Sequence, residues 1–365
     1  MARRRLSCDA AGESRQARDA HALGRAHALT RDAGIAYCRG LMAPKPTLLM
    51  LPPQTVTTRA WAARLGTALP ELSIVVAEDD DAALKEIAGA DAAFGTLPAD
   101  LVGRAGRLRW LQAPQAAPPA GFYSQALIAH PAVVTNFREI FNDHIGAHIM
   151  AFVLAFARGL QDYLPRQLRR EWRREPLDTG VIHLPEATML LVGVGGIGAE
   201  AARLAAAFGM RVIGVDARRH EAPPGVAELH GPDALDALLP RADFVVLTVP
   251  HTPATEGFMN RARFQRMKPT AFFINIGRGM TTRLDDLVAA LRAGEIAGAG
   301  LDVFEQEPLP ADHPLWTLPG VLITPHTAGF GPYLDDRRFD ILLDNCRRFL
   351  AGQPLRNVVD KPRWF

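Results

Sequence analysis

The sequence predicts an α/β protein made of two parallel-sheet domains, and three observations predict this class. The chain has 365 residues and is 48% hydrophobic, which is enough for two domains that each bury a core. Short apolar runs alternate with helical stretches along most of the chain, a pattern typical of parallel sheets covered on both faces. A glycine-rich turn, residues 193–198, stands between a predicted strand and a predicted helix.

The first half of the chain predicts five short strands with helices between several of them. The strands are Thr47–Leu51, Leu72–Ala77, Ala90–Phe94, Leu108–Leu111 and Val133–Asn136, and the helices include Thr58–Leu69 and Asp81–Ala88. Ala113–Gly121 contains three prolines and a glycine, so it is a loop. Because open α/β sheets bind ligands at the carboxyl ends of their strands, Gln115 and Ala116 in this loop are candidate substrate-binding residues.

The second half repeats the alternation and predicts six strands. A long helix, Asn142–Gly159, comes first, and we place the domain boundary near Asn142. The strands are Met189–Val192, Arg211–Val215, Phe244–Val249, Ala271–Ile276, Gly300–Phe304 and Val321–Thr324. A last helix, Leu334–Leu350, is expected to cross back to the first domain.

The glycine-rich turn has the residues that a dinucleotide requires. Gly193 permits a tight turn, Gly195 allows a pyrophosphate to approach the backbone, and Gly198 allows the helix to pack against the strand. The start of that helix offers N–H groups and a positive dipole end to phosphates. Asp216 ends the next strand, where a carboxylate accepts hydrogen bonds from a ribose and repels a 2′-phosphate. NAD is therefore the simpler cofactor, and Arg218 and Arg219 leave NADP possible.

Charge and composition exclude several other classes of protein. A net charge of +2 gives no reason to expect nucleic acid as a partner, and no apolar run approaches the roughly 20 residues that span a bilayer. The cysteines, Cys8, Cys38 and Cys346, show no disulfide or metal-ligand spacing, which favours a reduced, cytoplasmic protein without a metal. Residues 1–41 contain eight arginines and four acids and predict a disordered tail, and Met42 is a candidate start.

Three ionisable residues follow predicted strands of the second domain: Arg278, Glu307 and His326. A guanidinium binds a carboxylate with two hydrogen bonds and polarises a keto group. An imidazolium donates a proton to the keto oxygen as hydride reaches the carbon, and a nearby carboxylate orients it. Each residue alone is also compatible with an ordinary surface turn, but their shared location in the fold predicts a catalytic group acting on a 2-keto acid.

With these residues the sequence resembles the D-isomer-specific 2-hydroxyacid dehydrogenases over about Thr47–Val359. The matching motifs, in the order of the family, are GVGGIG with Asp216, VPHTPAT, NIGRG, GLDVFEQEP and PHTAG. The resemblance implies that Arg278, Glu307 and His326 are catalytic. It also implies a set of cofactor contacts: Gly196 and Ile197 at the pyrophosphate, Val249 and Pro250 on the adenosine side, and Ile276 and Asp302 at the nicotinamide end.

The same resemblance implies a domain arrangement and an assembly. Residues 42–142 with 326–365 would form a substrate-binding domain and 143–325 a Rossmann NAD-binding domain, with a tail over 1–41. Both would be Rossmann-like/flavodoxin-like parallel-sheet domains with a cleft between them. The protein would be a homodimer formed largely through its cofactor domains. The stretch FREIFNDHIGAH resembles glyoxylate and hydroxypyruvate reductases, whereas the loop Pro114–Pro119 departs from the Gly-Val-Asp turn common in the family.

The expected activity is therefore an NAD(P)H-dependent interconversion of a small 2-keto acid and its D-2-hydroxy acid. A formate or phosphite dehydrogenase on the same scaffold is one alternative. Glu307 disfavours formate, because the formate enzymes of this family resemble one another in having Gln, and not Glu, beside the histidine. A catalytically idle, NAD-sensing scaffold is the other alternative. The intact Arg, Glu and His disfavour it, while the basic tail fits a partner-binding role.

Overall fold

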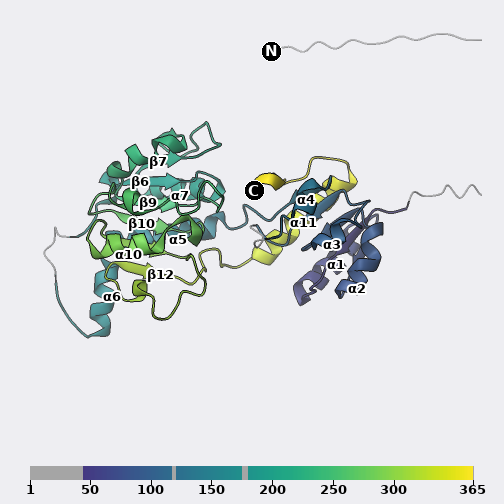
Figure 1. Cartoon of the computed structure of the whole chain (residues 1–365), viewed down its shortest axis with the longest axis horizontal. Helices are drawn as coiled ribbons and strands as arrows, with labels where there is room; N and C mark the ends of the chain where they lie inside the picture. The colour runs from purple at the N-terminus through teal and green to yellow at the C-terminus, as the bar shows by residue number, and fades with distance from the viewer. Residues whose placement is uncertain (1–43, 117–120, 175–179, 365) are drawn as a thin grey trace, which may run out of the picture. The chain divides into compact units, whose positions relative to one another are not determined.

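The computed structural model describes residues 44–116, 121–174 and 180–364, and the expected tail over 1–41 lies outside these residues. The described residues form two fully parallel sheets with helices between their strands, which confirms the predicted α/β class (Figure 1). One sheet has five strands and the other has seven. Among the described residues, no helix combines the length and the apolar character that crossing a membrane requires.

The five-stranded sheet has the order β2-β1-β3-β4-β5, which is the flavodoxin-like order. Its strands are β1 (Thr47–Met50), β2 (Ser73–Val76), β3 (Ala92–Phe94), β4 (Trp110–Gln112) and β5 (Val133–Thr135). Its helices are α1 (Val56–Ala68), α2 (Asp80–Glu86), α3 (Ala99–Val102), α4 (Gln125–Ala129) and α11 (Leu334–Leu350).

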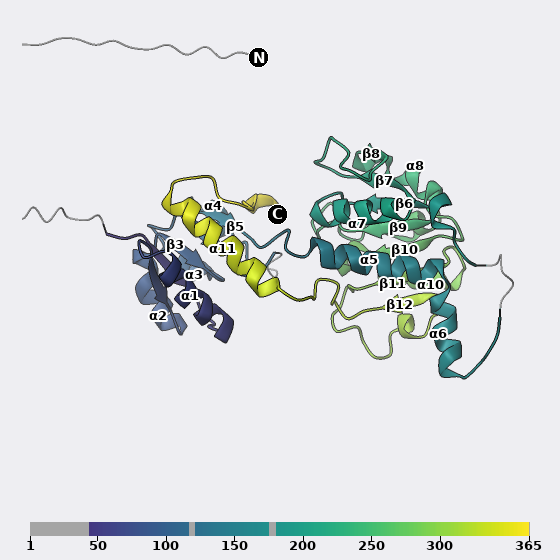
Figure 2. The same ribbon diagram turned by 180° about the vertical axis from the view of Figure 1, so that it is seen from behind.

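The helix α11 belongs to the five-stranded sheet although it comes last in the chain. Its Phe339 and Leu342 are buried in one apolar cluster with Trp61 and Leu65 of α1 and with Trp110 of β4. Figure 2 shows α11 in yellow beside α1 in purple. The predicted helix over Leu334–Leu350 is therefore confirmed, and it covers a sheet made by the first part of the chain.

The seven-stranded sheet has the order β12-β11-β10-β9-β6-β7-β8, the Rossmann order extended by one strand. Its strands are β6 (Thr188–Val192), β7 (Arg211–Val215), β8 (Glu228–His230), β9 (Phe244–Leu247), β10 (Phe272–Asn275), β11 (Gly298–Leu301) and β12 (Val321–Ile323). Its helices are α5 (Asn142–Ala157), α6 (Leu160–Leu168), α7 (Gly196–Ala207), α8 (Leu235–Leu238), α9 (Arg261–Phe264) and α10 (Leu284–Arg292).

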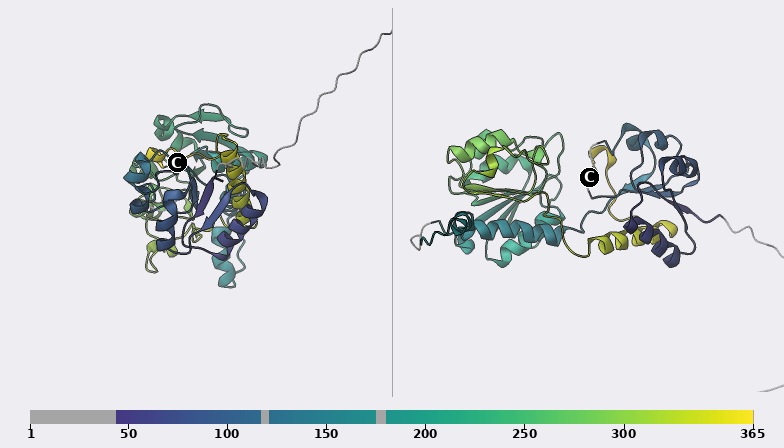
Figure 3. Two further views of the ribbon diagram at one scale, coloured as in Figure 1. Left: turned by 90° about the vertical axis from the view of Figure 1, so that its right-hand side faces the viewer. Right: turned by 90° about the horizontal axis from the view of Figure 1, so that it is seen from below.

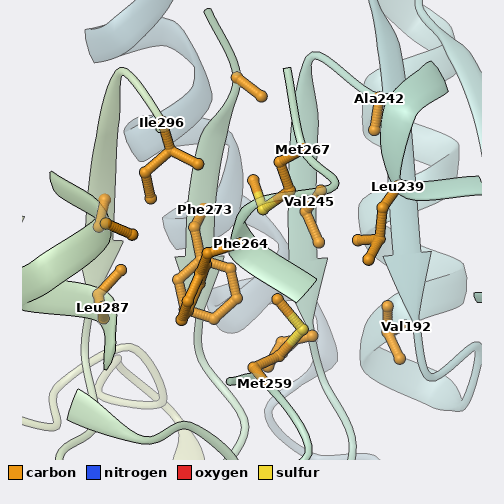
Figure 4. Close-up of a cluster of buried hydrophobic side chains, with 14 of the residues drawn as sticks. Val192, Leu239, Ala242, Val245, Met259, Phe264, Met267, Phe273, Leu287 and Ile296 are labelled. Atoms are coloured by element: carbon orange, nitrogen blue, oxygen red, sulfur yellow. The ribbon is translucent and has the colours of Figure 1, made fainter. Parts of the chain in front are cut away.

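Alternate residues of each central strand enter the cores on opposite faces of this sheet. Leu191 packs with the α5 and α7 side, whereas Leu190 packs with the α8, α9 and α10 side. In Figure 3 the strands accordingly lie between α5 in teal and α10 in green. Figure 4 shows the second core, in which Phe264 and Phe273 meet edge to face with ring centroids 5.3 Å apart. A sheet buried on both faces explains the continuous apolar runs in the sequence.

Three features of this sheet differ from the predictions. A seventh strand, β8, was missed because it has only three partly buried residues at the sheet edge. The helix α6 was missed because Pro165 predicts a helix end. The strand predicted over Gly300–Phe304 is β11, Gly298–Leu301; an added Cβ at Gly298 would lie 2.2 Å from the Gly320 oxygen, so close packing requires the glycine.

Candidate active site

The glycine-rich turn between β6 and α7 has the backbone geometry that its sequence suggests. Gly193 has a left-handed φ of +97°, and an added Cβ there would lie 2.9 Å from Val249 Cγ1. At Gly198 an added Cβ would lie 2.1 Å from the Gly193 oxygen, so this glycine permits the contact between helix and strand. At Gly195 no atom lies within 4 Å of such a Cβ, which leaves the backbone open to a ligand.

The N-terminus of α7 is suited to bind an anion. The helix begins at Gly196, and no side chain caps it. Gly195 and Gly196 are both exposed, and Ile197 beside them is half-buried. Uncapped N–H groups and the positive end of the helix dipole together favour a phosphate at this position.

Asp216, which follows β7, holds the glycine-rich turn. Its Oδ2 accepts a hydrogen bond from the Val194 N–H at 2.7 Å, and its Oδ1 accepts from the N–H groups of Arg218 and Arg219 at 2.8 and 2.9 Å. Burial by itself would raise the pKa of Asp216, but these backbone hydrogen bonds lower it below its usual value. Arg219 returns to the same turn, where its Nε donates to the Val194 oxygen at 2.8 Å.

Val249 lies between the glycine-rich turn and the turn that carries Arg278. Besides its contact with the Gly193 position, its backbone oxygen would lie only 2.6 Å from a Cβ at Gly277. Pro250 accepts a hydrogen bond from the Thr255 hydroxyl at 2.7 Å, and Ile276 is buried. The residues expected on the adenosine and nicotinamide sides thus belong to loops that touch one another.

Arg278 occupies a turn that a buried asparagine organises. The Asn275 side chain accepts a hydrogen bond from the Gly277 N–H at 3.0 Å and donates to the Arg278 oxygen and to the hydroxyls of Thr281 and Thr282. The Arg278 guanidinium donates to the Gly277 oxygen at 2.7 Å. Burial lowers the pKa of Arg278 from its usual value, and the charge of Glu307 opposes that shift.

Close backbone packing brings the Arg278 turn against the Glu307 loop. An added Cβ at Gly279 would lie 1.9 Å from the carbonyl carbon and oxygen of Phe304, so only glycine fits. Glu307 Oε1 in turn accepts the Phe304 N–H at 3.0 Å. The two charged residues, Arg278 and Glu307, are therefore neighbours although they follow different strands.

His326 and Glu307 form a hydrogen-bonded pair. His326 Nδ1 lies 2.7 Å from Glu307 Oε2, and the two side chains are 49% and 36% exposed, so both remain accessible to a small molecule. A carboxylate only accepts hydrogen bonds, so Nδ1 carries the proton in this pair. The other ring nitrogen, Nε2, is then the one that can exchange a proton with a substrate.

Asp302 anchors the turn in which His326 lies. Its Oδ1 accepts hydrogen bonds from the Thr324 hydroxyl at 2.6 Å and from the Thr327 N–H at 2.8 Å, and its Oδ2 accepts from the Ala328 N–H at 3.0 Å. His326 itself has a left-handed φ of 55°, which is uncommon for a residue with a side chain. The buried carboxylate thus stabilises an unfavourable backbone conformation next to the imidazole.

The structure brings the three predicted ionisable residues to one edge of the seven-stranded sheet. Gln115 and Ala116 belong to the five-stranded sheet, where the Ala116 oxygen accepts a hydrogen bond from Asn136 at 2.8 Å and Gln115 is exposed. The rest of that loop, residues 117–120, lies outside the described chain. Over residues 44–116, 121–174 and 180–364, no three His, Cys, Asp or Glu side chains are placed to hold a metal ion.

Sequence reasoning missed three residues that support this site: Asn275, Thr324 and His148. Asn275 begins the NIGRG motif and Thr324 ends the strand predicted before His326, so position in the motifs was an available signal. His148 gave a weaker sequence signal, because a histidine within an apolar helix indicates burial as readily as function. Its contact with Thr324 depends on the packing of α5 against the sheet.

The fold and this edge define the class: an α/β protein with a dinucleotide-binding turn and an Arg-Glu-His group beside it. The sequence profile of the D-isomer-specific 2-hydroxyacid dehydrogenase NAD-binding domain matches residues 150–328. A structure of a protein of this family from Aeromonas salmonicida is 34% identical, with a TM-score of 0.71, and the match covers 87% of this chain and 99% of that one. The chain belongs to the D-isomer-specific 2-hydroxyacid dehydrogenase family.

Two further relatives are informative. A family member from Xanthobacter autotrophicus in complex with NADPH and MES is 30% identical, with a TM-score of 0.75 and coverage of 88% of this chain and all 100% of that one. Glyoxylate reductase/hydroxypyruvate reductase from Homo sapiens is 39% identical over 175 residues, which are 47% of this chain and 52% of that protein. The chain thus spans about half the length of the curated relatives it matches.

Proposed function

We propose that the protein is an NAD(P)H-dependent oxidoreductase that interconverts a small 2-keto acid and its D-2-hydroxy acid. The observation that carries this proposal is the pair His326–Glu307 beside Arg278, because it combines a proton donor of defined tautomer with a cation suited to a carboxylate. The NAD-binding domain of the family supplies the cofactor side of the reaction.

In the reductive direction, a bound reduced nicotinamide cofactor would supply the hydride that the keto carbon requires. Arg278 binds the substrate carboxylate and polarises the keto group. His326 donates the proton from Nε2 to the keto oxygen, and Glu307 holds Nδ1–H and stabilises the imidazolium before that transfer. In the oxidative direction His326 removes the hydroxyl proton.

The residues present fit a dinucleotide. The open backbone at Gly195, with Gly196 and Ile197 at the start of α7, would hold the pyrophosphate. Val249 and Pro250 would line the adenosine side. At the nicotinamide end, beside Ile276, Asp302 Oδ2 accepts one hydrogen bond from the described part of the chain, the Ala328 N–H, and would have capacity for a carboxamide N–H.

Asp216 favours NAD, and Arg218 and Arg219 keep NADP as the alternative. The Asp216 carboxylate is ionised and would repel a 2′-phosphate, although three N–H groups already share its charge. The Xanthobacter relative was crystallised with NADPH. The choice between the two cofactors therefore depends on which charge, that of Asp216 or that of the arginines, determines the electrostatic potential at the 2′ position of the adenosine ribose.

Glyoxylate and hydroxypyruvate are the proposed substrate class. Residues 137–148 resemble the corresponding stretch of their reductases, and the human relative carries both names. The Gln115–Ala116 loop would bind the substrate on the side of the five-stranded sheet.

A cytoplasmic homodimer is proposed as the assembly. The helix α6 and the residues after it expose apolar side chains to water: Leu164 is 50% exposed, Leu168 87% and Trp172 97%. A patch of this kind is typical of a surface covered by a second copy. The variant Leu168→Glu should convert a dimer to a monomer in light scattering, and an unchanged mass would refute this interface.

The cytoplasmic location is supported by Cys346, whose thiol is free and buried, as expected in a reducing compartment.

The deciding experiment measures the oxidation of NADH and of NADPH separately with glyoxylate, hydroxypyruvate, pyruvate and a bulkier keto acid. Turnover with a small keto acid, abolished by His326→Ala, is the expected result. If the protein binds cofactor but reduces none of these acids, the proposed activity is contradicted, and a catalytically idle, NAD-sensing scaffold is the better description. Turnover of formate or phosphite instead would select the dehydrogenases that share this scaffold.

A further inference from the structure

A chain of three polar side chains connects helix α5 to the turn that carries His326. His148 on α5 lies with its Nε2 3.0 Å from the Thr324 hydroxyl, and Thr324 donates to Asp302 Oδ1 at 2.6 Å. His148 is mostly buried, with 22% of its side chain exposed, and its ring packs edge to face on Phe152 with centroids 4.9 Å apart. These contacts hold the imidazole in one orientation.

The direction of the hydrogen bonds along this chain follows from counting protons. The single proton of the Thr324 hydroxyl is donated to Asp302, so the Thr324 oxygen can only accept from His148. His148 must therefore carry its proton on Nε2. Burial lowers the pKa of His148, while the charge of Asp302 opposes the shift, so the ring is neutral near neutral pH with Nδ1 unprotonated.

The Asp302 carboxylate, which Thr324 orients, also binds the backbone of the turn that carries His326. The same Oδ1 that accepts from Thr324 also accepts the Thr327 N–H, and Oδ2 accepts the Ala328 N–H. These two amides follow His326, whose own φ of 55° is in the left-handed region and whose N–H donates to the Asp302 backbone oxygen at 2.9 Å. A rotation of the Asp302 carboxylate would therefore release the backbone that sets the direction of the imidazole.

We propose that His148 is a positioning residue for the reaction: through Thr324 it fixes the Asp302 carboxylate and thereby the turn that presents His326 to the substrate. His148 does not touch the reacting atoms. The inference rests on the proposed function, since it assigns His148 a role in the proton transfer by His326. The role of His148 requires a hydrogen-bond donor at one atom, Nε2. A different side chain that supplies a donor at the same position should therefore preserve the activity.

The test compares His148→Phe, which keeps a ring but removes the donor, with His148→Gln, which retains an N–H near the Nε2 position. Thr324→Val and Thr324→Ser form the matched pair on the next residue. For His148→Phe we expect kcat to fall about tenfold or more, with the KM for the keto acid and the Kd for the cofactor changed less than about threefold. His148→Gln and Thr324→Ser should recover most of kcat.

The double variant His148→Phe/Thr324→Val separates positioning from general loss of stability. If His148 acts through Thr324, the double variant should be no slower than the slower single variant, because both break the same chain. Multiplied losses in kcat would overturn the proposal, as would an unchanged kcat in His148→Phe. A lowered Tm with full kcat would show that the residue is only structural.

The two hypotheses fail in different ways. If the unmodified protein turns over a keto acid and His148→Phe is equally fast, the positioning role fails while the proposed function stands. If the unmodified protein binds cofactor and reduces no keto acid, the proposed function fails and the positioning role fails with it. Measuring cofactor binding by quenching of intrinsic fluorescence in every variant distinguishes these cases.

Discussion

The two parallel sheets of this protein share one construction and differ in where their polar residues lie. In the five-stranded sheet the buried polar side chains bind one another: Thr135 donates to Gln112 at 2.7 Å, and Asn345 of α11 donates to the same oxygen at 3.2 Å. In the seven-stranded sheet, the buried Asn275 and Asp302 bind the backbone of the turns that carry Arg278 and His326. Within those turns and loops, His326 and Glu307 remain partly accessible.

The proposed function assigns the chemistry to the seven-stranded sheet and substrate selection to the five-stranded sheet. The family profile covers the seven-stranded sheet and its loops, residues 150–328, and includes Arg278, Glu307 and His326. In the five-stranded sheet, the loop after β4 has Gln115 exposed. Substitutions in the first set should remove the reaction, and substitutions in the second should change what reacts.

The largest effect is expected at His326. Replacing it with Ala should lower kcat by about a thousandfold, because a positioned acid-base group contributes roughly two to four orders of magnitude. The Kd for the cofactor should stay within about threefold, since His326 lies outside the glycine-rich turn. Steady-state kinetics and a cofactor titration check this; equal losses of turnover and cofactor binding would contradict the assigned role.

Arg278→Lys should reduce kcat/KM for the keto acid by about a hundredfold. Lysine keeps the charge but loses the planar fork that binds a carboxylate with two hydrogen bonds. Arg104→Lys, at an exposed position of the other sheet, is a matched control that should be neutral. Unchanged keto-acid kinetics in Arg278→Lys would show that the substrate carboxylate binds elsewhere.

Asp216→Ser should shift cofactor preference toward NADPH by about tenfold in kcat/KM. The substitution removes the charge that repels a 2′-phosphate, while serine can still accept some of the hydrogen bonds from Val194, Arg218 and Arg219. The ratio of kcat/KM for NADPH and NADH is the measurement. If the unmodified protein already prefers NADPH and Asp216→Ser leaves the ratio constant, the arginines decide cofactor choice.

Gln115→Ala tests the other sheet. We expect the ratio of kcat/KM for hydroxypyruvate and glyoxylate to change by a few-fold, with kcat on the better substrate within about threefold, because this side chain contributes to fit and not to proton transfer. A loss of kcat/KM on both substrates as large as the one expected for Arg278→Lys would contradict the proposed division of roles between the sheets.

The smallest effect concerns pH and stability at His148. Its pKa is lowered in the folded chain from the ordinary 6.5, so below about pH 6.5 the unfolded chain takes up a proton that the folded chain resists. Stability should therefore fall as pH decreases through the window between the ordinary and the lowered pKa. Urea unfolding from pH 7.5 to pH 5 should show a shallower fall in His148→Gln; parallel curves would contradict this pKa direction.

Prediction from sequence worked best where local pattern and tertiary role coincide. The apolar runs of β6, β9 and β10 follow directly from burial on both faces of a parallel sheet. It failed at β8, whose short Glu-Leu-His strand has no apolar run and pairs only with β7 at the sheet edge. For β11 it predicted the strand but placed its start two residues late, because Gly298 and Gly300 are required by neighbours from Gly320 and Phe152 that no local pattern shows.

By itself the sequence determined the class of the protein, the glycine-rich turn and the candidates Arg278, Glu307 and His326, because each depends on residue type within a short motif. Only the tertiary structure decided that Glu307 meets His326 Nδ1, that Asp302 holds the turn after β12 and that His148 reaches Thr324 from α5. These contacts join residues on separate elements. Their partners and directions depend on how the helices and loops pack around the sheet, which local sequence does not encode.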